Sequence, residues 1–165
     1  MKKRMILLLL WVLVLSVAAM IFFFSSESGA ESSKTSAGVV DFLIHLFRPD
    51  FITLPRAEQA RLFQLYHSVV RKAAHFSEFA LLGFFLRPLL GALKRKHRFL
   101  LSWGIGTLYA CADELHQTLV AARASMWQDV CLDSAGALAG TAASALLLYL
   151  YRRYKKSKKK TERFG

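Results

Sequence analysis

Residues 5–24, MILLLLWVLVLSVAAMIFFF, are twenty consecutive residues without a charged side chain. A helix of this length rises about 30 Å, which matches the hydrocarbon core of a bilayer. The run exceeds the roughly 7–15 apolar residues usual in a secretory signal peptide. Ser28-Gly29-Ala30 does supply small residues that a signal peptidase uses, but the length favours an uncleaved membrane anchor.

Three further apolar runs, residues 73–93, 99–120 and 130–150, are long enough to cross a bilayer. The chain is 55% apolar, and the excess lies in these long runs, as is typical of small polytopic membrane proteins. The sequence therefore predicts an all-α fold. We expect a four-transmembrane-helix bundle that forms one domain over residues 1–150, followed by a basic tail, residues 151–165.

The net charge of +12 is unevenly distributed. Most Lys and Arg residues precede the first run, separate the second from the third, or follow the fourth, which is one side of the membrane if the helices alternate. The positive-inside rule then predicts that both termini are cytoplasmic in a multi-pass protein of the cell membrane. The tail adjoins no nucleic-acid-binding fold, so we expect no nucleic-acid partner and assign it to topology and anionic lipid.

The segment between the first two runs, residues 25–72, should lie outside. Its small polar beginning, residues 25–33, predicts a loop. Residues 39–47 predict a short helix, and Arg48-Pro49-Asp50 should end it. A second helix is expected to begin near Thr53 as a cap, with Pro55 in its first turn, and to continue into the second span. Both helices should lie at the outer interface.

Ionisable side chains occur near the same end of three predicted spans. The second span begins Arg71-Lys72-Ala73-Ala74-His75-Phe76-Ser77-Glu78, the third ends Asp113-Glu114-Leu115-His116-Gln117, and the fourth begins with Asp129 and Asp133. Charged groups near hydrocarbon are costly, so they should face one another or a wet cavity. Agreement in depth among three spans predicts a polar site at the outer end of the bundle.

Helical spacing suggests candidate roles within this site. Residues three and four apart share a face, so His75 and Glu78 lie on one stripe and Asp113 and His116 on another. A carboxylate beside an imidazole raises its basicity, which suits a general base, while cations suit a phosphate or carboxylate. The candidate catalytic residues are His75, Glu78, Asp113 and His116, and the candidate substrate-binding residues are Arg71, Lys72, Glu114, Gln117, Arg123, Asp129 and Asp133.

Structural roles compete with these assignments. Asp129 is suited to the N-terminus of a helix, and buried polar groups can tie helices together without a ligand. Gly136 and Gly140 form a small-xxx-small pattern that predicts a close helix contact. Arg87, near the inner end of the second span, is expected to extend to the cytoplasmic surface.

We expect no metal or cofactor, with a metal site as the alternative. The imidazole and carboxylate groups suit zinc, but they are divided between helices and form no compact His-Glu-x-x-His motif. Cys111 and Cys131 are expected to be buried as small apolar residues, with a disulfide between them left open.

Together these motifs resemble the VanZ-like family of small bacterial membrane proteins, named for a teicoplanin-resistance determinant. The resemblance rests on residues 71–79, 113–117, Arg123, Asp129 and the following glycines, and also on Phe24-Ser25-Ser26. Where the family usually has Pro-Gly-Arg, this chain has Ala121-Ala122-Arg123, so the arginine is kept without the tight turn. The resemblance implies a role in the bacterial cell envelope, and the family's name associates it with antibiotic resistance.

Two functions fit the sequence. The favoured one is an outward-facing site that binds or acts on a lipid headgroup, a lipid-linked cell-wall precursor or a lipoglycopeptide of the teicoplanin type. The other is a non-enzymatic membrane protein whose buried polar network is structural and which acts by partner or drug binding. No nucleophile or phosphate-loop motif decides whether the protein is an enzyme, and no inverted repeat favours a transporter.

Overall fold

The structure is a computed structural model that describes residues 2–120 and 126–164, apart from the side chains of residues 2, 160, 161, 163 and 164. Helices account for nearly all of these residues, and no strand occurs among them, which confirms the all-α prediction. The elements are α1 (Lys2–Ser26), α2 (Gly29–Phe47), the 3-10 helix η1 (Phe51–Thr53), α3 (Arg56–Leu89), α4 (Arg95–Gln117) and α5 (Trp127–Phe164).

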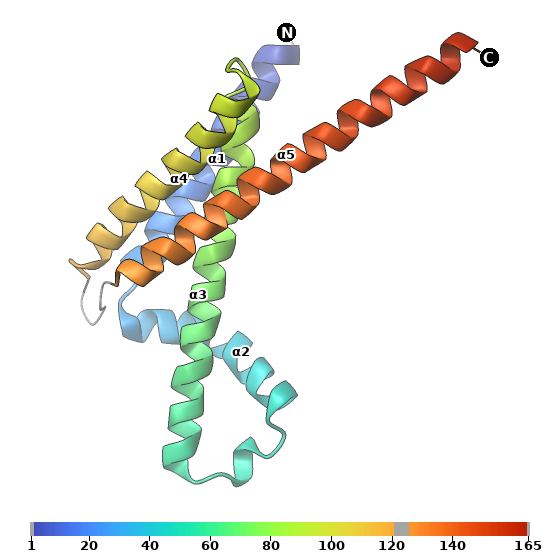
Figure 1. The fold of residues 1–165 in the computed structure, drawn as a ribbon. Helices are drawn as coiled ribbons and strands as arrows, with labels where there is room; N and C mark the ends of the chain where they lie inside the picture. The colour runs from blue at the N-terminus through green and yellow to red at the C-terminus, as the bar shows by residue number, and fades with distance from the viewer. Residues whose placement is uncertain (1, 121–125, 165) are drawn as a thin grey trace.

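Four helices, α1, α3, α4 and α5, pack side by side, and both termini lie at the same end of this bundle (Figure 1). At the opposite end, the ends of α1 and α4 meet the beginning of α5. There α2 and the first half of α3 extend beyond the bundle, so one end carries an added helical layer (Figure 1). The apolar core lies between the helices and includes Val17, Ile21, Phe79, Leu82 and Ala110.

Two helical segments are long and apolar enough to cross a membrane, Lys3–Ser26 and Trp127–Lys159. Large apolar side chains of α1 point away from the protein, as Met5, Leu8 and Phe23 are each about two-thirds exposed. Lipid chains would cover such a surface. Charged residues lower the mean hydropathy of α3 and α4, so the count of four spans stays a prediction.

The beginning of α2 differs from the expected loop. Ser28 caps the helix, because its hydroxyl accepts a hydrogen bond from the Glu31 backbone N–H at 3.3 Å. The Glu31 carboxylate accepts one in return from the Ser28 N–H at 2.8 Å. This reciprocal capping box stabilises the first turn. The prediction of a loop over residues 25–33 was therefore wrong: α2 begins at Gly29.

The connection from α2 to α3 follows the prediction only in part. Helix α2 ends at Phe47, before the expected break, and α3 runs without interruption from Arg56 to Leu89, through the second predicted span. Thr53 does not cap α3, because it lies in η1 and donates its hydroxyl hydrogen to the carbonyl oxygen of Asp50 at 2.7 Å. Pro55 instead occupies the N-cap position, where its missing N–H is no loss.

Glycine permits the close crossing of α3 and α5. A Cβ atom built on Gly140 would lie 1.7 Å from the carbonyl oxygen of Ala80, and one on Gly136 would lie 2.4 Å from that of Phe76. Gly83 of α3 faces the Ala137 carbonyl of α5 in the same way, at 2.2 Å. Any side chain at these positions would push the backbones apart. The predicted small-xxx-small contact is confirmed.

Three other expectations fail. Arg87 is 3% exposed and does not extend to the surface, and its Nε has no hydrogen-bond partner among the described residues. Cys111 and Cys131 were expected to be buried, but both are exposed and their thiols are free. Since both lie on helices predicted to span the bilayer, such exposed faces would contact lipid.

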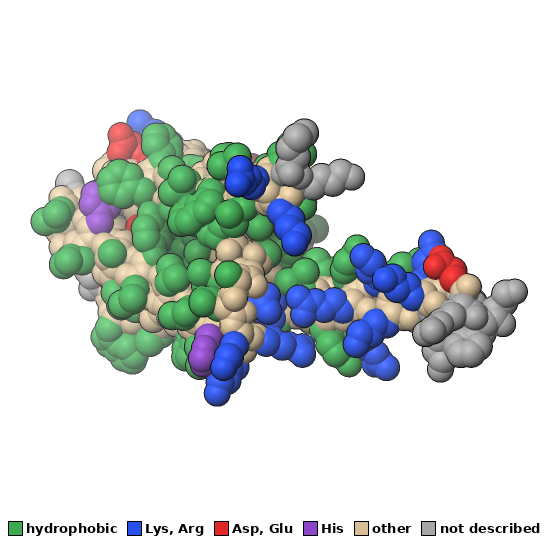
Figure 2. Space-filling view, turned by 90° about the horizontal axis from the view of Figure 1, so that it is seen from above, with side chains coloured by type: hydrophobic (Ala, Val, Ile, Leu, Met, Phe, Trp, Pro, Cys, Tyr) green, Lys and Arg blue, Asp and Glu red, His purple; other side chains and the backbone are tan. Residues whose placement is uncertain are grey.

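The basic tail continues α5 as a helix to Phe164. Figure 2 shows Lys and Arg side chains along this projecting end and hydrophobic side chains over much of the bundle beside it. Charge therefore gathers at the end of the molecule that carries both termini.

Candidate functional site

A group of buried polar residues lies where α1 and α4 end, α5 begins and α3 passes through. Each member is at most 9% exposed, although nearly all are ionisable or strongly polar. We call this group the polar cluster; its members are Ser25, His75, Glu78, Asp113, Glu114, Gln117 and Asp133. Six of the seven were predicted from the sequence, because they lie near the same end of the predicted spans.

The seventh member, Ser25, connects α1 to α4. Its hydroxyl donates to Asp113 Oδ2 at 2.7 Å. Gln117 Nε2 donates to the same oxygen at 2.8 Å and to the Ser25 hydroxyl at 3.3 Å. Among the described residues, the hydrogen-bond partners of Asp113 are thus neutral side chains. The sequence signal for Ser25 was its position directly after the first apolar run.

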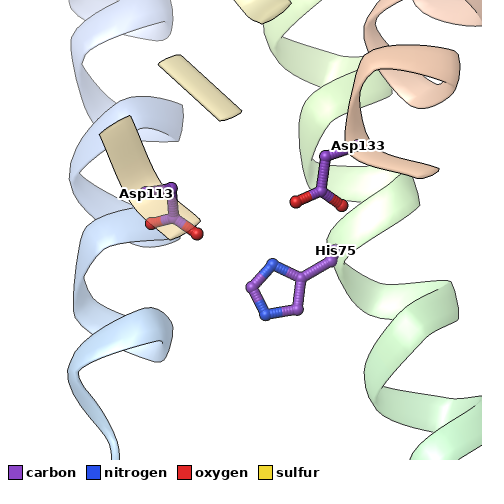
Figure 3. Close-up of side chains that lie close together, drawn as sticks. All are labelled: His75, Asp113 and Asp133. Atoms are coloured by element: carbon purple, nitrogen blue, oxygen red, sulfur yellow. The ribbon is translucent and has the colours of Figure 1, made fainter. Parts of the chain in front are cut away.

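His75 and Glu78 lie one turn apart on α3, with 4.0 Å between His75 Nδ1 and Glu78 Oε2. This is the carboxylate beside an imidazole that the helical spacing predicted. One ligand atom each of His75, Asp113 and Asp133 lies within 4.8 Å of the other two. Figure 3 shows the three side chains pointing into one space between the helices that carry them.

Two cations of α3 lie beside the cluster and contact α5. Lys72 Nζ is 3.1 Å from Asp129 Oδ1, and the Arg71 guanidinium is 3.9 Å from Asp129 Oδ2. The two cations are partly exposed, and Asp129 is less so. Asp129 therefore lies where it can act as their shared counter-ion, in the first turn of α5.

Glu114 contacts the beginning of α5 rather than the centre of the cluster. Its Oε1 accepts a hydrogen bond from the Met126 backbone N–H at 2.6 Å. This bond joins the end of α4 to the residue that precedes α5. It gives Glu114 a structural contact beside the substrate-binding role expected of it.

His116 faces α1 and is not among the members of the polar cluster. Its Nε2 lies 3.1 Å from the Ser26 hydroxyl, and its ring stacks on Phe22 with 4.7 Å between centroids. The hydrogen-bond partners of Asp113 are Ser25 and Gln117, so the expected His116–Asp113 pair does not form among the described contacts. Instead, stacking on Phe22 and the contact with Ser26 hold the His116 ring against α1. Arg123 lies outside the described residues.

Two cavities adjoin the cluster. The larger, about 160 Å³, is lined by the end of α1, by α2 and by α3, and combines Arg71, His75 and Glu78 with apolar Phe24 and Val70. The smaller, about 10 Å³, is lined by Arg71, Lys72, His75, Gln117, Asp129, Leu132 and Asp133. His75 and Arg71 line both, so the cluster has access to each.

The fold and the cluster define a class of protein: a small helical membrane protein with ionisable residues buried at one end of its bundle. The model of the VanZ/LLP1 family matches residues 10–150, and the chain belongs to this family. The match contains every member of the polar cluster and confirms the resemblance found in the sequence. No curated protein and no solved structure matches the chain.

Proposed function

We propose that this membrane protein of the VanZ/LLP1 family binds the polar headgroup of an amphiphilic envelope molecule in the larger cavity. A phospholipid headgroup, a lipid-linked cell-wall intermediate or a lipoglycopeptide has the required chemistry. One observation supports this most: the cavity of about 160 Å³ combines ionisable Arg71, His75 and Glu78 with apolar Phe24 and Val70. An amphiphile presents the same combination at a membrane interface.

The proposed orientation has four spans, both termini in the cytoplasm and the polar cluster facing outward. Its support is the charge distribution, since Lys and Arg gather at the end that carries the termini. The polar cluster lies at the other end, under the layer formed by α2 and the first half of α3. An outward site would receive molecules from the outer leaflet and the cell wall.

The cavity offers two kinds of chemistry. Arg71 supplies a guanidinium, which suits the paired oxygens of a phosphate or carboxylate. His75 with Glu78 beside it is suited to accept or donate a proton. The 4.0 Å between them is longer than a hydrogen bond, and catalytic contacts of this kind often shorten when a substrate binds. We therefore propose binding of the headgroup as the function. If the protein is an enzyme, His75 is the residue that transfers a proton to or from the bound molecule.

A second candidate is a structural network in a protein that acts through partner or drug binding. The contacts of Asp113 favour it, since Ser25 and Gln117 saturate one of its oxygens and tie α1 to α4. In that case removal of one buried partner should destabilise the protein by about 3–5 kcal/mol.

Lipid that co-purifies with the protein separates the two functions. Native mass spectrometry of the full chain in detergent should show bound anionic amphiphile in the wild type and much less in Arg71→Ala and His75→Ala, at unchanged thermal stability. Arg61→Ala is the matched control, because Arg61 is an exposed cation of the same helix that lines neither cavity adjoining the cluster.

Variants of the polar cluster can also be tested in cells. His75→Ala and Asp113→Asn should change susceptibility to a lipoglycopeptide while immunoblots show an unchanged amount of protein. If protein and phenotype decline together, the network is structural and the binding function is wrong.

A further inference from the structure

We infer that His75, Asp113 and Asp133 form a binding site for one divalent transition-metal ion of the Zn²⁺ or Mn²⁺ type. The inference deepens the proposed function and rests on it, because the site lies in the same polar cluster. Its three residues come from α3, α4 and α5, so an ion there would join three helices (Figure 3).

The distances suit a metal ion. Nitrogen and oxygen ligands bind Zn²⁺ at about 2.0–2.2 Å in tetrahedral geometry, so two ligand atoms of one ion are separated by about 3.3–3.6 Å. The ligand atoms of the three residues all lie within 4.8 Å of one another. Side-chain shifts of less than about one ångström would therefore complete the coordination.

Asp133 supplies an independent indication of a ligand. Its side chain is 3% exposed, and its Oδ1 has no hydrogen-bond partner among the described residues. Figure 3 shows this carboxylate directed toward the space it shares with His75 and Asp113. A buried carboxylate oxygen without a partner is unfavourable, and a metal ion in that space would provide the missing contact.

The charge balance points in the same direction. Four carboxylates are buried in the cluster, those of Glu78, Asp113, Glu114 and Asp133. Within residues 2–120 and 126–164, the two cations beside them, Arg71 and Lys72, both pair with Asp129. Among these described residues negative charge is in excess, and a divalent cation would reduce it at the point where three helices meet.

The surroundings resemble the outer contacts of metal ligands. Ser25 and Gln117 hydrogen-bond Asp113 Oδ2 and so orient the carboxylate. Glu78 Oε2 lies 4.0 Å from His75 Nδ1, so a further carboxylate stands beside the imidazole. Carboxylates beside ligating histidines and hydrogen bonds to ligating carboxylates are regular features of metal sites.

Room for a further ligand adjoins the three residues. The cavity of about 10 Å³ beside His75 and Asp133 has roughly the volume that one water molecule needs. Three protein ligands leave a coordination position open, so a water or an oxygen of an anionic headgroup can complete the shell. Arg71 and Lys72 line the same cavity and suit the remaining charge of such a headgroup.

The donor set selects the kind of metal. Imidazole with carboxylates suits Zn²⁺ and Mn²⁺, whereas Mg²⁺ and Ca²⁺ favour oxygen ligands alone and Cu⁺ favours sulfur. The sequence predicted no metal because the candidate ligands are divided between helices and form no compact motif, whereas the fold brings ligand atoms of His75, Asp113 and Asp133 within 4.8 Å of one another.

Isothermal titration of the full, untagged, EDTA-stripped chain with Zn²⁺ and with Mn²⁺ tests the inference. One ion of at least one of them should bind per chain, and Asp133→Asn should weaken its binding about 10- to 100-fold at unchanged helix content. Asp41→Asn, an exposed acid of α2, is the matched control. Absence of binding, or wild-type affinity in Asp133→Asn, would overturn the metal site.

A second measurement needs no variant. Co²⁺ added to the stripped wild type should give visible ligand-field bands that Zn²⁺ or Mn²⁺ removes; featureless spectra at saturating Co²⁺ would count against the site. Lipid co-purification should be compared in stripped and metal-loaded protein. Lipid binding without metal binding would refute the metal site and leave the proposed function. Metal binding without lipid binding would support the metal site and refute the proposed function.

Discussion

Ser25 and Asp113 are 88 positions apart in the chain, and a hydrogen bond of 2.7 Å joins them inside the polar cluster. The serine lies one residue before the end of α1, and the aspartate lies four residues before the end of α4. The bond closes one end of the bundle, because it fixes α1 against the helix that carries three of the seven cluster residues.

Ser25→Ala should destabilise the protein by about 1–3 kcal/mol, since the substitution removes a donor from a buried carboxylate. Thermal unfolding in detergent measures the change. Ser77→Ala is the control: Ser77 is exposed, and its hydroxyl donates to the Ala73 carbonyl of its own helix. Equal stability of the two variants would show that the Ser25–Asp113 bond contributes nothing.

Gly140→Ala should separate α3 from α5 and cost at least about 1–3 kcal/mol, as overpacking of a close contact does. The new methyl group would meet the Ala80 carbonyl of the facing backbone, which cannot rotate away. Gly104→Ala provides the comparison, because nothing lies within 4 Å of a Cβ at that position. Unfolding midpoints of the two variants should differ, with Gly104→Ala close to the wild type.

The membership of the polar cluster could be predicted from sequence because depth in a span depends only on residue number. His75, Asp113 and Asp133 had to lie at a similar depth once the spans were placed. Partners within that layer depend on how each helix is rotated and where it crosses its neighbours. His116 illustrates the difference: it has the right depth, but contacts Ser26 and Phe22 of α1.

In the segment between α1 and α3, local sequence patterns predict where a helix begins but not how it packs. Ser28 followed three residues later by Glu31 is a capping-box pattern, and it marks the start of α2 that small polar composition concealed. The position of α2 against α3 involves contacts between distant residues, which no local pattern specifies.

The capping box makes the first turn of α2 sensitive to acid. Hydrogen bonds from the side chain and backbone of Ser28 hold the pKa of Glu31 below its usual value. A lowered pKa in the folded state means that the stabilisation is present above the ordinary glutamate pKa of about 4.3 and is lost as the pH falls through the folded-state pKa. Amide hydrogen exchange at the start of α2, corrected for the intrinsic effect of pH, should lose protection at lower pH. Glu31→Gln should lack this pH response.

Thiol labelling tests the proposed topology. In a background with Cys111→Ala and Cys131→Ala, a cysteine at Ala30 should react with an impermeant reagent in intact cells. A cysteine at Lys158 should react only after lysis. Both positions are exposed in the structure, so a difference between them reports sidedness. Labelling at Lys158 alone would reverse the orientation and place the polar cluster on the cytoplasmic side.

Asp129→Asn should strengthen the binding of anionic amphiphiles. In the structure Asp129 neutralises Lys72 at 3.1 Å and Arg71 at 3.9 Å, so the substitution would free both cations for a ligand. A partly exposed ion pair of this kind contributes about 0.2–1 kcal/mol, which corresponds to an affinity gain of up to about five-fold. A fluorescent anionic lipid titrated into nanodiscs measures the change, with Asp41→Asn as the exposed control. Weaker binding in Asp129→Asn would mean that this carboxylate contacts the ligand itself, as the sequence predicted, and that the two cations are not the anion site.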